Sequence, residues 1–222
     1  MASVCIVRPP TIYAANNLTT MYTPPLGVAY IAGSLRAAGY DVQVLDSVGE
    51  SLDTRHKVGD DCYYYGLSFE EIVDAIDPET QIIGVTFNFS FEYPESRDLA
   101  KAIRDRFPDA LFIGGGEHIT AVPIQSLEES VLDVGVLGEG EETIVEIVSG
   151  YFQKELEFST IDGIAYKDQM GKVIVNPRRA RKREIDDIPW PAWDLIPLEN
   201  YLEKGYGFGV HRGRSIPLMA SR

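Results

Sequence analysis

Four short apolar runs in this chain each stop abruptly at glycine, proline or polar residues, and this pattern constrains the fold more than any other feature. The sharpest stop is Gly114-Gly115-Gly116, directly after the apolar residues 110–113. Glycine at the end of a buried strand lets another backbone or a ligand come close. In an open parallel sheet all these stops lie on one edge, where such folds bind ligands. The alternative is that glycine merely ends each strand. The other three stops are Arg8-Pro9-Pro10 after residues 4–7, Thr86-Phe87-Asn88 after residues 82–85, and Gly138-Glu139-Gly140-Glu141 after residues 134–137.

The composition limits the classes of protein that fit. An apolar share of 45% in 222 residues suffices for a packed core. The formal net charge of −14 disfavours a surface for nucleic acid or anionic membrane, because phosphates would be repelled. Two cysteines, Cys5 and Cys62, form neither a disulfide framework nor a C-x-x-C metal site, and we expect Cys5 to be a small core residue. Without a signal peptide or an apolar run long enough to span a membrane, the cytoplasm is the expected location.

Short strands alternate with amphipathic helices over the first 155 residues. Ser68 and Glu71 fit a capping box at the start of one of these helices. Residues 11–23 are expected to form a polar loop and residues 46–68 an irregular segment. The alternation predicts a parallel α/β sheet built by right-handed crossovers. Strands are expected at residues 4–7, 41–45, 81–86, 111–113 and 134–137, and helices at residues 26–38, 68–76, 94–107, 123–130 and 141–152.

The character of the sequence changes after Tyr151. Residues 163–167 and 173–176 predict a β-hairpin. A basic run at residues 178–183 is expected to pair with the acidic body of the protein. The proline-rich stretch that follows is typical of a linker, and Trp190 and Trp193 are expected to anchor it on apolar surface. We therefore predict two parts, residues 1–155 and an extension of residues 156–222.

The expected ligand edge carries little positive charge. No Lys or Arg occurs between Arg106 and Lys154, a stretch that includes two of the glycine-rich stops. A dinucleotide fingerprint is absent after the first strand, and the carboxylates of Glu139 and Glu141 would repel a phosphate. These features favour a large, weakly charged ligand held by backbone and shape. The glutamates have an equally good interpretation as helix caps, because acids suit a helix N-terminus.

Histidines and tyrosines are the remaining candidates for a functional role. His118 lies two residues past the triple glycine, so it either touches the ligand or is structural. His56 and His211 stand in polar or glycine-rich stretches and are expected at the surface. Tyr63-Tyr64-Tyr65 could line a site, although packing of an irregular segment is the favoured interpretation. The sequence contains no Ser-His-Asp spacing or metal-ligand cluster that supports hydrolytic or metal chemistry.

Taken together, these motifs resemble the N-terminal cobalamin-binding domain of cobalamin-dependent radical S-adenosylmethionine (SAM) enzymes. The resemblance covers nearly the whole chain. In that family a Met-Ala-Ser-Arg-like segment continues into the C-x-x-x-C-x-x-C motif of an iron–sulfur cluster. Because this chain stops at Met219-Ala220-Ser221-Arg222, the resemblance implies a catalytic barrel beyond it. The stretches that carry the resemblance are Pro24-Pro25-Leu26-Gly27, Leu35-Arg36-Ala37-Ala38-Gly39-Tyr40, Gly114-Gly115-Gly116-Glu117-His118-Ile119-Thr120 (close to the family's G-G-x-H-x-T/P pattern), Gly138-Glu139-Gly140-Glu141 and Ile185-Asp186-Asp187-Ile188-Pro189.

The resemblance implies a flavodoxin-like fold with a five-stranded parallel sheet of order 2-1-3-4-5. It implies cobalamin as the cofactor of this domain, with the corrin across the carboxyl edge and the nucleotide tail in a groove where any glycine Cβ would block it. The [4Fe-4S] cluster and SAM are expected only in the barrel, so methyl transfer or radical cyclisation belongs to the intact parent, and this chain alone is expected to be inactive. The residues that the resemblance assigns to the cofactor are Pro10, Thr11, Leu26, Gly27, Thr86, Phe87, Asn88, Gly114, Gly115, Gly116, Glu117, His118, Gly138, Glu139, Gly140 and Glu141.

The resemblance also bears on which group binds the cobalt of cobalamin from below the corrin ring. Many cobalamin modules supply a histidine from a D-x-H-x-x-G motif after the first strand, but residues 8–23 contain neither histidine nor aspartate. The resemblance therefore implies cobalamin with its own base displaced and no protein histidine on the cobalt. The alternative function is a flavodoxin-like or receiver-like regulatory domain that binds a flavin, another small ligand or a protein partner. A receiver would need a lysine after the fifth strand, and none is present there.

Overall fold

The structure is a computed structural model that describes residues 3–14, 22–59, 61–182, 184–205 and 213–219. At its centre, five parallel strands lie in the order β3-β1-β6-β7-β8. Counted along the chain, this is the order 2-1-3-4-5 expected above, and the α/β class with a mostly parallel sheet is confirmed. Each strand lies at one of the five strand positions expected from the sequence, to within one or two residues: β1 (Val4–Arg8), β3 (Val42–Asp46), β6 (Ile82–Thr86), β7 (Leu111–Gly115) and β8 (Val134–Val136).

The predicted hairpin forms β9 (Ile164–Lys167) and β10 (Val173–Val175) and joins the same sheet. β10 pairs antiparallel with β9, and β9 pairs antiparallel with β8. The described sheet therefore has seven strands instead of the expected five, in the order β10-β9-β8-β7-β6-β1-β3. The hairpin covers the open edge of β8, which would otherwise present unpaired backbone groups to solvent.

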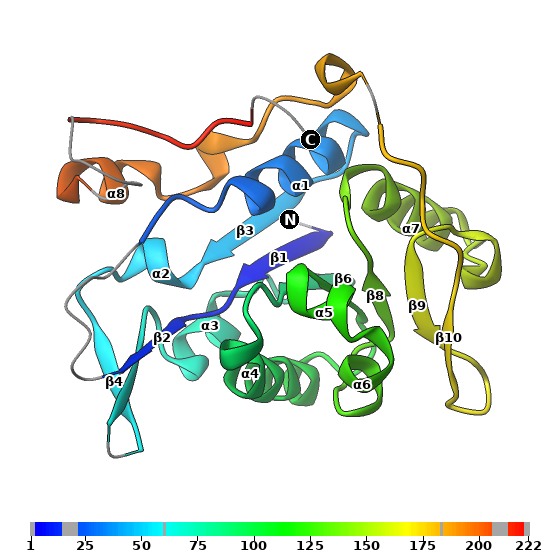
Figure 1. Ribbon diagram of the computed structural model, residues 1–222, viewed down its shortest axis with the longest axis horizontal. Helices are drawn as coiled ribbons and strands as arrows, with labels where there is room; N and C mark the ends of the chain where they lie inside the picture. The colour runs from blue at the N-terminus through cyan, green and yellow to red at the C-terminus, as the bar shows by residue number, and fades with distance from the viewer. Residues whose placement is uncertain (1–2, 15–21, 60, 183, 206–212, 220–222) are drawn as a thin grey trace.

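Helices cover both faces of the sheet (Figure 1). Because side chains alternate along a strand, Val4 and Ile6 of β1 pack on one face, while Cys5 and Val7 pack on the other. Cys5 is fully buried, as expected from the sequence. The first face is covered by α1 (Leu26–Ala37) and α7 (Glu141–Gln153), and the second by α3 (Phe69–Ala75), α4 (Tyr93–Arg106), α5 (Glu117–Ala121) and α6 (Pro123–Glu128). The predicted capping box at the start of α3 is confirmed, since Ser68 and Glu71 exchange both hydrogen bonds.

A second, smaller sheet replaces much of the expected loop and irregular segment. Its antiparallel order is β2-β5-β4, with β2 (Thr11–Ala14), β4 (Arg55–Val58) and β5 (Cys62–Tyr65). Tyr13, Tyr22 and Tyr65 pack edge-to-face or tilted with ring centroids 5.8–5.9 Å apart. These aromatic contacts across distant segments hold the small sheet together, so packing, the favoured interpretation of the tyrosine run, is what the structure shows.

The segment after β10 folds back over the domain and includes α8 (Leu198–Lys204), which packs near the short helix α2 (Ser47–Glu50) (Figure 1). Ala192, Ile196 and Tyr201 are its buried anchors. Trp193 packs partly buried against the core, but the expected anchoring role of Trp190 is wrong, because that side chain is 85% exposed. Short 3-10 helices complete the described chain at Ser90–Glu92 (η1), Phe158–Thr160, Ile185–Asp187 and Trp193–Leu195.

The basic run after β10 pairs with the acidic surface of α7, as expected. Arg179 bonds to Glu146, and Lys182 donates to Glu142 at 2.9 Å. No helix in the described part of the chain is both long and apolar enough to cross a membrane.

Candidate functional site

The carboxyl ends of the parallel strands meet at one edge, and the residues assigned from the sequence lie at or beside it. Pro10 and Thr11 follow β1, and Leu26 and Gly27 begin α1, the helix that returns from this edge. The other assigned residues come from three strand ends: Thr86, Phe87 and Asn88 at β6, Gly114 to His118 at β7, and Gly138 to Glu141 after β8. The topology therefore brings together residues that are far apart in the sequence.

The surroundings of the three glycines in the triplet differ in how much room they leave for a side chain. A Cβ on Gly114 would clash with Leu132, and a Cβ on Gly116 would lie 2.5 Å from the backbone oxygen of Phe87. Gly116 also has φ +114°, which L side chains rarely adopt. Gly115 has no positive φ, and no atom of the described residues lies within 4 Å of where its Cβ would be. Of the triplet, only Gly115 leaves room that the described protein does not itself fill.

Gly115 faces the side of the sheet that α1 and α7 cover. Its neighbour Ile113 packs in the core on that side, and Gly114 between them points toward Leu132 on the opposite side. Thr86 lies beside Gly115 in register and shares its face. A Cβ on Gly27 at the start of α1, or on Gly138 before α7, would likewise meet no described atom within 4 Å. Small side chains thus leave room for a bulky group beside the first turns of α1 and α7.

The opposite face of the same edge is closed by the protein itself. The backbone N–H of Phe87 donates to the Gly115 oxygen at 2.7 Å, and that of His118 donates to the Phe87 oxygen at 3.0 Å. The His118 ring is buried, with Nδ1 2.9 Å from Ser90 Oγ and its centroid 4.2 Å from the Tyr93 ring. Burial lowers the pKa of His118, which keeps the imidazole neutral near pH 7. These contacts make His118 a packing residue in this structure.

The turn before α7 is tied to the turn after β7. Gly138 donates its N–H to Thr120 Oγ1 at 2.9 Å, and Thr120 donates its own N–H to the Gly116 oxygen at 3.1 Å. Glu117 and Glu141 lie in the first turns of α5 and α7, where carboxylates suit the helix dipole. Among the described residues, no group of His, Cys, Asp and Glu side chains could hold a metal ion.

An ion-pair cluster that the sequence analysis did not identify fixes the β1–β3 end of the edge. Arg8 Nη1 donates to Asp46 Oδ1 at 3.2 Å, to the Tyr201 hydroxyl at 2.7 Å and to the Thr23 backbone oxygen at 3.2 Å. The Tyr201 hydroxyl donates to Asp46 Oδ2 at 2.6 Å, and burial raises its pKa. A signal was present in the sequence, since Arg8 and Asp46 each end an apolar strand. The cluster links α8 to the segment that leads into α1.

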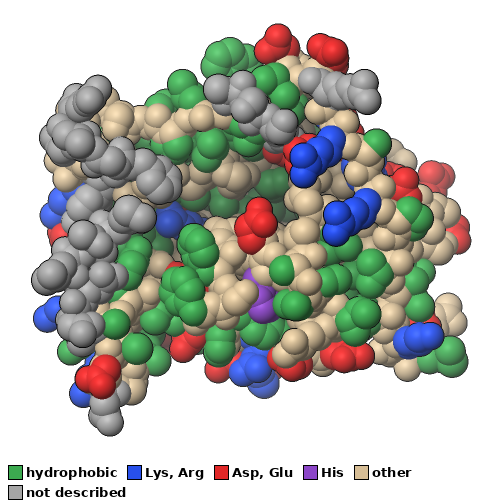
Figure 2. All heavy atoms as spheres, viewed as in Figure 1, with side chains coloured by type: hydrophobic (Ala, Val, Ile, Leu, Met, Phe, Trp, Pro, Cys, Tyr) green, Lys and Arg blue, Asp and Glu red, His purple; other side chains and the backbone are tan. Residues whose placement is uncertain are grey.

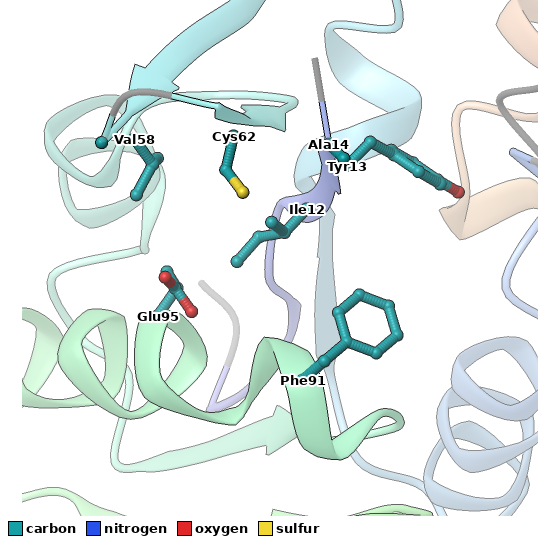
Figure 3. Close-up of a pocket in the computed structure, with 8 residues that line it drawn as sticks. Ile12, Tyr13, Ala14, Val58, Cys62, Phe91 and Glu95 are labelled. Atoms are coloured by element: carbon teal, nitrogen blue, oxygen red, sulfur yellow. The ribbon is translucent and has the colours of Figure 1, made fainter. Parts of the chain in front are cut away.

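A pocket of about 570 Å³ opens beside the segments that follow β1 and β6 (Figure 3). Ile12 and Ala14 line it from the segment after β1, and Phe91 and Glu95 line it from the segment after β6. The helices that follow β1 and β6 cover opposite faces of the sheet, which makes this pair the topological switch point where open α/β sheets bind ligands. The sequence analysis placed Thr11 here but did not find the pocket, because the small sheet that forms one wall was not expected.

Exposed hydrophobic side chains adjoin the edge. Phe89 and Phe91 are 56% and 62% exposed and stack on each other with centroids 5.6 Å apart, and Ile124 on α6 is 51% exposed. Figure 2 shows hydrophobic side chains over the region of α5 and the start of α4. Apolar surface of this kind is typical of a face that a ligand or partner covers.

Sequence comparison identifies relatives that are much longer than this chain. A family model described as the B12 binding domain matches residues 16–148. An uncharacterized methyltransferase of Pyrococcus horikoshii is 32% identical over 208 residues, which is 93% of this chain and 41% of that protein. The anaerobic magnesium-protoporphyrin IX monomethyl ester cyclase of Rubrivivax gelatinosus is 30% identical over 183 residues, or 81% of this chain and 30% of the cyclase. The chain thus spans less than half the length of each of these relatives.

Structural comparison supports the fold. A solved structure of the cobalamin-dependent S-adenosylmethionine radical enzyme OxsB, with aqua-cobalamin and S-adenosylmethionine bound, superposes with a TM-score of 0.66. The match covers 88% of this chain and 24% of that protein at 18% sequence identity. At this identity the likeness concerns the fold alone, and it places the α/β sheet described above among folds of the same type.

Proposed function

We propose, because this chain belongs to the B12-binding domain family, that the carboxyl edge of its sheet holds cobalamin against the catalytic barrel of a radical SAM enzyme. Cobalamin is the cofactor of such a domain. The observation that carries the placement is Gly115, the one glycine of the triplet whose smallness the described protein does not itself require. It lies within the matched residues, on the edge where an open α/β sheet binds its ligand.

The residues present fit a large, mostly neutral ligand. Thr86 and Gly115 end their strands with small side chains, and Gly27 and Gly138 leave open space at the starts of α1 and α7. We place the nucleotide tail of cobalamin there, on the α1/α7 face, since the opposite face is closed by packed side chains. No Lys or Arg lies between Arg106 and Lys154, so shape and backbone groups would hold the tail. Bound cobalamin supplies a cobalt that can carry a methyl group or change its oxidation state.

We further propose that no histidine of this domain binds the cobalt. The segment after β1 has no histidine. His118 is packed against Tyr93 and Ser90, and His56 on β4 lies 3.2 Å from the Gly66 backbone oxygen. His211 lies outside the described residues. Electron paramagnetic resonance of bound cob(II)alamin tests this proposal, because an axial nitrogen would split the cobalt lines and contradict it.

The activity of the whole protein is a proposal that depends on its relatives. The two relatives described above are a methyltransferase and a cyclase by name, and we propose methyl transfer or radical cyclisation for the intact parent, with the [4Fe-4S] cluster and SAM in its barrel. We propose that residues 1–155 hold the cofactor in the cytoplasm and that residues 156–222 lead toward the barrel. Because β9 of the second part pairs with β8 of the first, both parts contribute strands to one sheet. The boundary at residue 155 therefore divides the proposed roles and does not divide the sheet. The exposed Phe89 and Phe91 beside the edge suit contact with the barrel.

The test is co-elution with the cofactor. The purified chain is mixed with hydroxocobalamin or with flavin mononucleotide, passed over gel filtration, and examined by its visible spectrum. We expect the cobalamin spectrum, and no flavin spectrum, in the protein peak. Flavin without cobalamin would contradict the proposed function. The same experiment on the full-length parent controls for corrin contacts that the barrel contributes.

A further inference from the structure

The pocket at the switch point contains one carboxylate that its surroundings leave unsatisfied. Glu92 and Glu95 lie three residues apart, Glu92 ending η1 and Glu95 in the first turn of α4, on one side of the helix start. Glu92 bonds to the Thr11 hydroxyl and accepts the Ile12 N–H at 3.2 Å, so it fastens β2. Glu95 Oε2 is buried, and among the described residues no hydrogen-bond partner reaches it. A buried acceptor without a donor is costly, so this oxygen suits a ligand that brings an N–H group.

The rest of the pocket wall selects an uncharged ligand. Ile12, Val58 and Phe91 present apolar side chains, and Cys62 adds a thiol. Figure 3 shows Phe91 and Glu95 rising from α4 and its preceding turn, with Val58 and Cys62 facing them across the cavity and Ile12 between. None of the described residues that line the pocket is a Lys or an Arg. A ligand group with an apolar stem and an amide N–H tip therefore fits, whereas a carboxylate tip would meet Glu95 as a like charge.

We infer that this pocket binds a carboxamide arm on the rim of the corrin, with Glu95 Oε2 accepting its N–H. The inference rests on the proposed function, since the corrin bears such acetamide and propionamide arms. It assigns the β2–α4 pocket a role separate from the tail site beside Gly115. The switch point then recognises the rim of the cofactor while the α1/α7 face recognises its nucleotide.

A charge-exchange experiment tests the contact. Dissociation constants are measured by visible titration at one neutral pH for cyanocobalamin and for its three monocarboxylic acid derivatives, each with one propionamide arm hydrolysed. We expect one derivative to bind the wild-type chain more weakly on the order of tenfold, because like charges repel in a partly buried site. Glu95→Gln should bring that derivative to within about twofold of cyanocobalamin. Glu128→Gln, an exposed change on α6, should retain the wild-type discrimination.

A second readout uses the thiol on the pocket wall. Cys62 is partly exposed, whereas Cys5 is fully buried and burial raises its pKa, so a maleimide should label Cys62 alone. Saturating cyanocobalamin should slow this labelling at least several-fold, and Cys62→Ser should abolish it. If cobalamin binds but the acids bind like the amide and labelling keeps its rate, the pocket assignment is overturned and the proposed function stands. If neither this chain nor the full-length parent binds cobalamin, both are overturned.

Discussion

The two faces of the central sheet end differently at its carboxyl edge. On the face of α3 and α4, Leu132 and the backbone of Phe87 fill the space next to Gly114 and Gly116, and both residues are at most 1% exposed. On the face of α1 and α7, the strands end in Thr86 and Gly115, and no described protein atom lies within 4 Å of the Cβ position of Gly115. A bulky ligand group can therefore enter on the α1/α7 face without displacing a core side chain. In the same motif, Gly114 and Gly116 allow close packing on one face, and Gly115 leaves space for a ligand on the other.

The largest effect is expected at Gly116. Gly116→Ala would place a Cβ 2.5 Å from the Phe87 backbone oxygen at φ +114°. A backbone atom cannot move aside as a side-chain end can, so the free energy of unfolding should fall by about 4 kcal/mol. Urea unfolding followed by circular dichroism measures it. A loss below about 1 kcal/mol would show that the closed face tolerates change and would remove the contrast between the faces.

A smaller loss is expected at Gly114. Gly114→Ala would overlap the Leu132 side chain, which can shift within the core, so we expect a loss of about 2 kcal/mol. Combining it with Leu132→Val should recover part of that loss, because the shorter side chain leaves space for the new methyl group. If the double variant is no more stable than the sum of the two single changes predicts, the overlap is not the cause.

The linker over α1 offers a matched pair of tryptophans. Trp193 packs partly buried against the core, whereas Trp190 is 85% exposed. Trp193→Ala should lower the free energy of unfolding by about 1–2 kcal/mol, and Trp190→Ala should change it by less than about 0.5 kcal/mol. Thermal melts and limited proteolysis near residues 187–198 measure the difference. Equal melting temperatures for the two variants would argue against docking of the linker through Trp193.

The smallest effect concerns pH and the closed face. Burial lowers the pKa of His118, so the folded protein binds this proton less readily than the unfolded chain does. Stability should therefore fall as the pH drops through about 6.5, the ordinary histidine pKa. Between pH 7.5 and 5.5, the melting temperature of His118→Gln should fall by less than that of wild type. His56→Gln serves as the control and should follow wild type. If the melting temperatures of all three proteins fall equally over this pH range, the burial of His118 is not the cause of the pH dependence.

The sequence predicted the parallel sheet well, because apolar runs and helical periodicity are local signals. The order of its strands was implied by the resemblance to a known family and not by these local signals. The capping box at Ser68 and Glu71 is local too, and it formed as expected. The small sheet was missed because β2 pairs with a strand about fifty residues away, and its tyrosines contact across that separation. The hairpin was found, but local patterns do not reveal which edge of a sheet a hairpin joins.

The position of the candidate ligand edge could be predicted from the sequence, but the packing around its glycines could not. Glycine-rich stops located the edge, yet a sequence cannot show that Gly114 and Gly116 are occupied by Leu132 and Phe87 while Gly115 is open. Trp190 illustrates the same limit. Its backbone oxygen, and not its ring, approaches α1 closely at Gly33, and Ala192 donates its N–H to the Ala29 oxygen at 2.8 Å. Composition marked the linker but not the direction of its side chains.

The most direct test of the central claim is the affinity of Gly115 variants for cobalamin. Gly115→Val should keep the wild-type melting temperature within a few degrees, because no described protein atom lies within 4 Å of the position of its Cβ. It should lose cobalamin binding by at least about a hundredfold, with Gly115→Ala intermediate, because the side chain occupies the space of the tail. Ala75→Val, an exposed addition at the end of α3, should bind like wild type. Wild-type affinity in a folded Gly115→Val protein would contradict the placement of the cofactor on the α1/α7 face.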